Sequence, residues 1–153
     1  MRVPALQIAQ TLEPIVGEMC RRSPTFRRQL IRLAAAPGLV LTVAIRRVAT
    51  SSYAEATTRF AREHRRLSRA DVEIGPADHA SLVELIAHEL EHVLEQLDGV
   101  NLPQLAQSPG VSVNHHQRGR SFETARARQI GLDVAAEFNA GSVAASKGQV
   151  VRR

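Results

Sequence analysis

The strongest constraint on the fold is a long amphipathic helix that the sequence predicts over residues 79–98. Asp78 is a typical helix N-cap, and Gly99 is a typical residue for the position just past a helix end. At 100° per residue, most apolar side chains of this segment fall on one stripe. The stripe comprises Leu82, Ile86, Leu90, Val93 and Leu97, with Val83 and Leu94 at its edge. We expect this stripe to face the protein core.

His88 and His92 lie on the opposite side of the same predicted helix. A spacing of i and i+4 puts two imidazoles side by side, close enough to bind one Zn²⁺ ion. Glu89 follows the first histidine, where a carboxylate can act as general base for an attacking water. This position argues against histidines that are satisfied inside the core. The alternative to a zinc site is a pair of solvated surface histidines.

A catalytic zinc ion usually takes three protein ligands, so the chain must supply a third. Asp98 lies six residues after His92, a spacing that requires a glycine turn where this chain has Glu95 in unbroken helix. Glu123 is the better candidate, because it heads an otherwise apolar face of a last predicted helix. That face continues through Ala127, Ile130, Val134 and Phe138. Burying a carboxylate on an apolar face costs free energy unless it has a partner, such as a bound cation. The alternative interpretation is that Glu123 only lies in a first turn, where the helix dipole favours an acid.

The residues before the central helix predict helices and then strands. Residues 4–35 have a helical pattern in two pieces, of which the first is interrupted at Pro14 and the second is capped by Ser23, with Pro24 at its first position. The apolar face of the second piece comprises Phe26, Leu30 and Leu33. Three segments follow: a strand over 38–45, a segment over 53–69 that fits either a helix or a strand, and a short half-exposed strand over 71–74.

After the central helix, the sequence predicts a loop, a helix and a tail. The loop covers residues 99–120, the helix runs from Ser121 to about Asn139 and is stopped by Gly141, and the tail over 142–153 is small, basic and disordered. These elements predict an α+β protein. They divide the chain into an N-terminal helical segment (1–36), a compact domain (37–141) and the tail (142–153).

Composition narrows the classes of function. The net charge of this 153-residue chain is +5, but the arginines are spread over three regions and only 3% of residues are aromatic, so a nucleic-acid partner is not expected. No apolar run is long enough to cross a membrane, and no signal peptide is visible, so we expect a cytoplasmic protein without a membrane partner.

Cys20 is the single cysteine, which excludes a multi-cysteine zinc site. A zinc site must then consist of histidine and carboxylate, the ligand set of catalytic zinc.

The run His88-Glu89-Leu90-Glu91-His92, followed by a helix that carries Phe122-Glu123-Thr124-Ala125, resembles the gluzincin zinc metallopeptidases. The single-domain minigluzincins are the most similar kind, and the resemblance covers about residues 38–140. It implies a small zincin-like domain with a short mixed sheet, an active-site helix and a glutamate helix, preceded by the N-terminal helices. It also implies one Zn²⁺ ion held by His88, His92 and Glu123, with Glu89 as the general base.

The resemblance further implies where substrate binds. The strand around Val72, Glu73 and Ile74 would be the edge strand to which an extended peptide adds. Ala127 stands where many gluzincins have an aspartate that hydrogen-bonds a ligand histidine. Either another acceptor replaces that aspartate or the metal is held less tightly.

The expected function is therefore a zinc metallopeptidase that hydrolyses a peptide or protein substrate. A donor for the oxyanion is also required, and the candidates are His115 and His116, with Arg118 and Tyr53 as further choices. The alternative is a zinc-binding domain of zincin fold without proteolytic activity, a scaffold or a regulator. Glu89 favours the enzyme, because a site that only holds metal does not need this carboxylate. The sequence does not indicate the oligomeric state.

Overall fold

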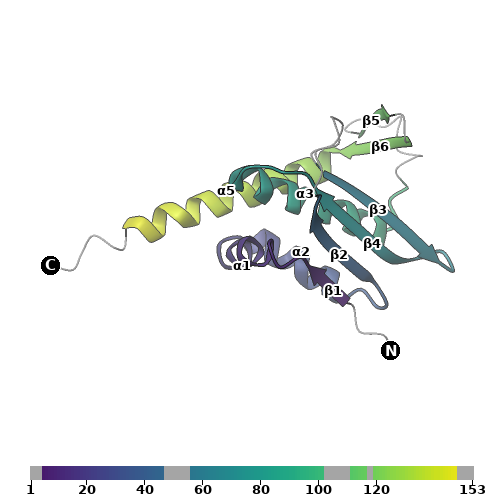
Figure 1. Cartoon of the computed structure of the whole chain (residues 1–153), viewed down its shortest axis with the longest axis horizontal. Coiled ribbons are helices and arrows are strands. Elements are labelled where there is room, and N and C mark those ends of the chain that lie inside the picture. The colour runs from purple at the N-terminus through teal and green to yellow at the C-terminus, as the bar shows by residue number, and fades with distance from the viewer. Residues whose placement is uncertain (1–4, 47–55, 102–110, 117–118, 148–153) are drawn as a thin grey trace.

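The computed structural model describes residues 5–46, 56–101, 111–116 and 119–147 of the chain, and omits the side chains of 111–122 and 142–147. It confirms the α+β class (Figure 1). In chain order the elements are β1 (Ala5–Ile8), α1 (Glu13–Arg22), α2 (Pro24–Ala34), β2 (Val40–Ile45), β3 (Ala56–Glu63), β4 (Arg66–Ile74), α3 (His79–Leu97), β5 (Val111–His116), β6 (Gly119–Thr124) and α5 (Ala125–Lys147). None of the helices within the described residues is both long and apolar enough to span a membrane.

Four strands form a mixed sheet in the order β1-β2-β4-β3. β1, β2 and β4 run parallel, whereas β3 is antiparallel to β4. The hairpin between β3 and β4 turns at His64 and Arg65, which both have positive φ angles, as a tight two-residue turn requires. The segment over 53–69, which the sequence left open between helix and strand, therefore contains β3, the turn and the start of β4 in its described part.

The order of the strands corrects one expectation. β4, which carries Val72, Glu73 and Ile74, is paired on both sides, with β2 and with β3, so it is not an edge strand. The edge on that side of the sheet is β3. The physical cause is that β3 lies in the segment whose pattern did not distinguish strand from helix. Because β3 was not recognised as a strand, β4 was expected to have no partner on that side.

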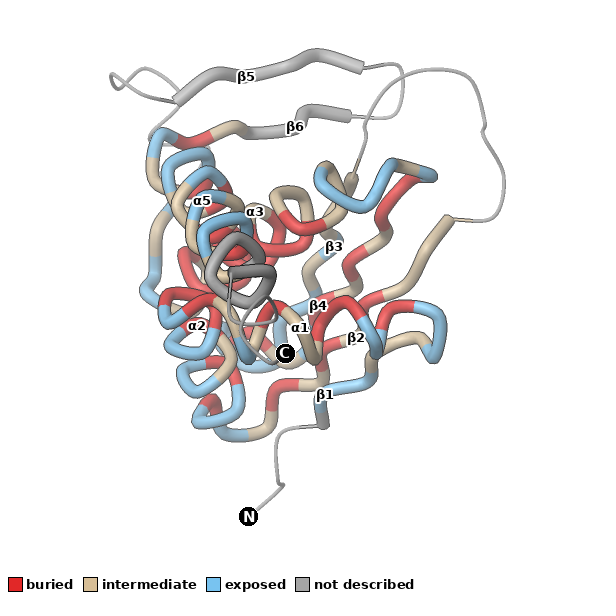
Figure 2. Tube along the Cα trace, turned by 90° about the vertical axis from the view of Figure 1, so that its left-hand side faces the viewer, coloured by how far each residue is buried: buried red, intermediate tan, exposed pale blue. Residues whose placement is uncertain are grey.

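One face of the sheet packs on α3, which in turn contacts α2 and α5. The inward side chains alternate along β2 and β4, as the two-residue period of a strand requires, and they include Leu41, Val43, Ala70, Val72 and Ile74. α3 is buried almost all round, and Figure 2 shows the buried residues gathered along α3 and the inner strands. The predicted bounds of this helix are confirmed: Asp78 is its N-cap and Gly99, with a φ of 78°, follows its C-cap.

The N-terminal segment is not all helical as predicted. Residues 5–8 form β1, which pairs with β2, and Pro14 lies in the first turn of α1 instead of interrupting a helix. A proline is tolerated there because the first helical N–H groups have no partner within the helix. Ser23 is confirmed as the N-cap of α2, since its hydroxyl accepts a hydrogen bond from the amide of Phe26 at 3.0 Å. α1 and α2 contribute to the same core as the sheet and α3.

The region after α3 differs more from the prediction. The expected loop over 99–120 contains β5 and the first two residues of β6, and these two strands form a separate antiparallel hairpin. The last helix begins at Ala125 and continues past Gly141 to Lys147, so the start of the predicted disordered tail is helical. The apolar face predicted for this helix is confirmed by buried Ala127, Val134 and Phe138, with Ile130 packed beside them.

Candidate metal centre

α3 brings His88 and His92 together on one side, one helical turn apart. Their Nε2 atoms are 3.1 Å from each other, and the two rings meet edge to face with centroids 4.8 Å apart. Of the side-chain surface, 13% of His88 and 7% of His92 is exposed. The alternative of two solvated surface histidines is therefore wrong.

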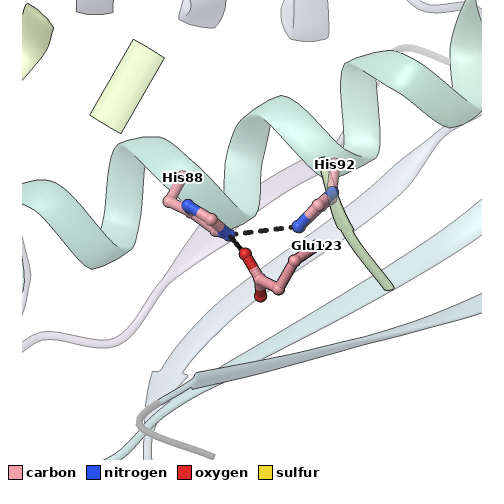
Figure 3. Close-up of side chains that lie close together, drawn as sticks. All are labelled: His88, His92 and Glu123. Atoms are coloured by element: carbon pink, nitrogen blue, oxygen red, sulfur yellow. Dashed lines mark hydrogen bonds and ion pairs between the residues drawn. The ribbon is translucent and has the colours of Figure 1, made fainter. Parts of the chain in front are cut away.

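Glu123 reaches the histidines from a different element. It lies on β6, one residue before the end of that strand, and not in the first turn of a helix as predicted. Its Oε2 atom is 3.0 Å from Nε2 of His88. The helix dipole therefore does not account for this carboxylate, whereas its contact with His88 does (Figure 3).

The three side chains fit a divalent metal ion. Their ligand atoms all lie within 4.8 Å of one another, and they are the one such group of three found among the described residues. In a tetrahedral zinc site with bonds of about 2.0–2.1 Å, ligand atoms are about 3.3 Å apart, close to the two spacings observed here. Two imidazoles and a carboxylate are a zinc ligand set. One third of the Glu123 side chain is exposed, so the group is open to solvent on that side.

The charges of the site are coupled. Burial alone would lower the pKa of His88, but the hydrogen bond with Glu123 and the charges of Glu123, Glu89 and Glu84 raise it above its ordinary value. The same hydrogen bond with His88 lowers the pKa of Glu123, against the opposing effect of burial. Negative charge is thus concentrated around His88, as a cation site requires.

Glu89 is buried next to this group. The hydroxyl of Thr58, on the edge strand β3, donates a hydrogen bond of 2.5 Å to its Oε2 atom. Thr58 lies opposite Val72 in the sheet, in a row of residues that faces α3. The contact holds the carboxylate between α3 and the edge of the sheet.

His92 has a second partner, on the side away from His88. Its Nδ1 atom lies 2.8 Å from Oε2 of Glu95, a carboxylate that is 2% exposed. The hydroxyl of Thr124 donates to Oε1 of the same carboxylate at 2.6 Å and accepts a hydrogen bond from the amide of Ala127 at 3.0 Å. Burial would raise the pKa of Glu95, but the hydrogen bonds from His92 and Thr124 lower it below its ordinary value.

The structure does not bring every predicted site residue to this group. Val72 and Ile74 face the core and are fully buried, and Glu73 pairs with Arg46 and Arg59. Since β4 is also internal, these three residues do not form the substrate-binding edge that was expected.

The two oxyanion candidates lie on β5. The backbone of His115 is opposite Arg120 and that of His116 is opposite Gly119. At about 3.4 Å per residue, Arg120 is about 10 Å along β6 from Glu123. The side chains of both histidines lie outside the described part, as do Tyr53 and Arg118, so the oxyanion donor stays a prediction.

Asp98 binds Arg32 and Arg126 instead of the histidines, in agreement with its rejection as a zinc ligand.

Sequence reasoning missed three residues of the site: Thr58, Glu95 and Thr124. Glu95 had a usable signal, because residues three apart on a helix are neighbours and His92 is three residues before it. Thr124 is a good helix N-cap, but so is Ser121, and the sequence alone does not choose between them. Thr58 had no local signal, since its contact with Glu89 depends on the pairing of β3 with β4.

Comparisons of the chain with protein-family models, with curated proteins and with solved structures found no match. The geometry and chemistry of the site are therefore the basis for assigning a function.

Proposed function

We propose that this protein is a zinc-dependent metallopeptidase of zincin-like fold. The observation that carries the proposal is the convergence of His88, His92 and Glu123, which come from α3 and β6, into one group of ligand atoms. Glu89 supplies the carboxylate that peptide hydrolysis needs beside such a group. The gluzincin resemblance of the sequence agrees with this assignment.

In the proposed reaction, His88, His92 and Glu123 would hold the zinc ion. Zinc, when bound, lowers the pKa of a coordinated water toward 7 and polarises a substrate carbonyl. Glu89 accepts the proton of the attacking water and returns it to the amine of the leaving group. The hydroxyl of Thr58, bonded to Oε2 of Glu89, keeps the carboxylate in one orientation during both transfers.

The substrate would lie along β3. This strand is the edge of the sheet beside the site, and its Thr58 contacts Glu89 directly. A peptide that adds to an exposed edge gains main-chain hydrogen bonds along its length. Added to β3, it would pass the Glu89 carboxylate. This replaces the expectation that β4 binds the peptide.

The proposal is tested by comparing wild-type protein with Glu89→Gln at equal zinc content, on a protein substrate such as casein and on a mixture of fluorogenic peptides. Loss of a general base is expected to reduce hydrolysis by about 10²–10⁴-fold. Glu91→Gln is a matched control, since Glu91 is a buried carboxylate of the same helix that binds Gln29 and Arg126. It should hydrolyse at close to the wild-type rate. Equal hydrolysis by Glu89→Gln and wild type would contradict the proposal, and zinc binding with no hydrolysis by wild type would favour the non-proteolytic alternative.

A further inference from the structure

Glu95 connects two of the three candidate ligands through one carboxylate. One of its oxygens lies against Nδ1 of His92, and the other accepts the hydroxyl of Thr124, which follows Glu123 directly in the chain. The carboxylate is 2% exposed. A buried charge of this kind is costly without hydrogen-bonding partners, and here both oxygens have one.

The contact with His92 determines which ring nitrogen faces the other ligands. A carboxylate accepts hydrogen bonds, so Nδ1 of His92 must carry the proton. The lone pair of Nε2 then points toward His88, on the side where Glu123 also lies. A ligand histidine with a carboxylate on its other nitrogen is held in orientation and is more basic.

The contact between Glu95 and Thr124 restrains the position of the third candidate ligand, Glu123. The hydroxyl of Thr124 donates to Glu95 and accepts from the amide of Ala127, so it also caps the first turn of α5. The chain therefore changes from β6 to α5 at Thr124, a residue that is hydrogen-bonded to α3 through Glu95. Glu123, one residue before this point, is carried toward His88 by the same connection.

We propose that Glu95 and Thr124 are positioning residues for zinc binding, with Glu95 orienting His92 directly and Thr124 placing Glu123. In many members of the family that the sequence resembles, an aspartate at the position of Ala127 orients a ligand histidine. Ala127 is fully buried here, and the acceptor comes from α3 instead. The inference rests on the zinc site of the proposed function, but not on peptide hydrolysis.

The test measures zinc affinity by competition with a chromophoric chelator, and thermal unfolding of the zinc-free protein, in matched pairs of variants. Glu95→Gln keeps the shape of the side chain and removes its charge, and Glu91→Gln does the same to a carboxylate that does not touch a histidine. Thr124→Val removes the hydroxyl, and Thr124→Ser keeps it. Glu95→Gln and Thr124→Val should each bind zinc about 10- to 100-fold more weakly, whereas Glu91→Gln and Thr124→Ser should stay within about threefold of wild type.

The outcomes separate the inference from the proposed function. Wild-type affinity in Glu95→Gln and Thr124→Val would overturn the inference even if the protein hydrolyses peptides. An equal loss of zinc affinity in Glu91→Gln would also overturn the inference, because it would indicate a general effect of altering α3. If Glu95→Gln does not fold, the Thr124 pair decides alone. Weaker zinc binding in the predicted variants of a protein that hydrolyses no peptide would support the inference and contradict the proposed function, and a wild-type protein that binds no zinc would overturn both.

Discussion

Three buried glutamates on α3 have three different sets of partners. Glu89 accepts from Thr58, Glu91 from Gln29 and Arg126, and Glu95 from His92 and Thr124. Burying a charge costs several kcal/mol unless it is paired or hydrogen-bonded. The partner of each glutamate therefore indicates its use. Glu91 ties α3 to α2 and α5, whereas Glu89 and Glu95 surround the histidines.

At the scale of the single residue, Gly131 sets how closely α5 approaches the candidate metal ligand His88. A Cβ atom added there would lie 3.1 Å from the carbonyl oxygen of Glu84 and 3.3 Å from Cβ of His88. Both neighbours belong to α3, and neither is the end of a flexible side chain. The absence of a side chain at Gly131 thus allows α5 to pack directly beside a candidate ligand.

Gly131→Ala is expected to destabilise the protein by about 1–3 kcal/mol, because the two helices must separate. It should also weaken zinc binding, since His88 is displaced. Gly17→Ala is the control: a Cβ there meets only the end of the Arg21 side chain, at 3.5 Å, and should stabilise α1 by about 0.5–1 kcal/mol. Denaturant unfolding and chelator competition measure the two effects. A Gly131→Ala protein as stable as wild type would show that the helices are not in close contact.

At the scale of the elements, α5 is anchored to the start of α2 by Glu137. Its carboxylate accepts the hydroxyl of Ser23 at 2.5 Å, and the amide and hydroxyl of Thr25 at 3.0 and 2.7 Å. The amides at the start of a helix otherwise have no partner within the helix. Burial raises the pKa of Glu137, but these donors and the charge of Arg28 outweigh it and hold the pKa below its ordinary value.

The lowered pKa predicts a pH dependence of stability. The unfolded chain has a glutamate pKa of about 4.3, so the contribution of Glu137 is fully present above that pH and is lost as the pH falls through the lower folded-state value. We expect the melting temperature of wild type to exceed that of Glu137→Gln by a constant difference between about pH 5 and 8. Below about pH 4 this difference should become smaller. Melting curves of both proteins across this range measure it. A margin that stays constant down to pH 3 would contradict the role of this carboxylate.

The elements that were predicted correctly have local signals. α3 is bounded by a capping aspartate and a glycine with positive φ, and α2 by Ser23, each of which acts within a few residues. β1 was missed because its partner β2 lies beyond two helices in the chain, and the hairpin of β5 and β6 was expected to be a loop followed by helix. β3 was left open between helix and strand. The end of β6 at Thr124 has no local signal, since it depends on Glu95, almost thirty residues earlier in the chain. The convergence of His88, His92 and Glu123 was predicted, although Glu123 was assigned to the wrong element.

At the scale of the whole molecule, the N-terminal segment is part of the structure that supports the site. Met19, Phe26 and Leu33, from α1 and α2, belong to the same buried cluster as Leu90 and Val93 of α3. The β1 strand extends the sheet on the side opposite β3. The division of the chain at residue 36 stays a prediction, and this shared core argues against a domain of residues 37–141 that folds alone.

The main proposal is that His88, His92 and Glu123, which lie far apart in the sequence or on different elements, meet to hold one zinc ion. Its most direct test is metal analysis of wild type, His88→Ala, Glu123→Ala and Asp98→Asn after dialysis against the same buffered zinc solution. Asp98 is the control, because it binds arginines and not the histidines. We expect one zinc ion per chain in wild type and Asp98→Asn, and well below one in His88→Ala and Glu123→Ala. Full zinc content in both His88→Ala and Glu123→Ala would contradict it.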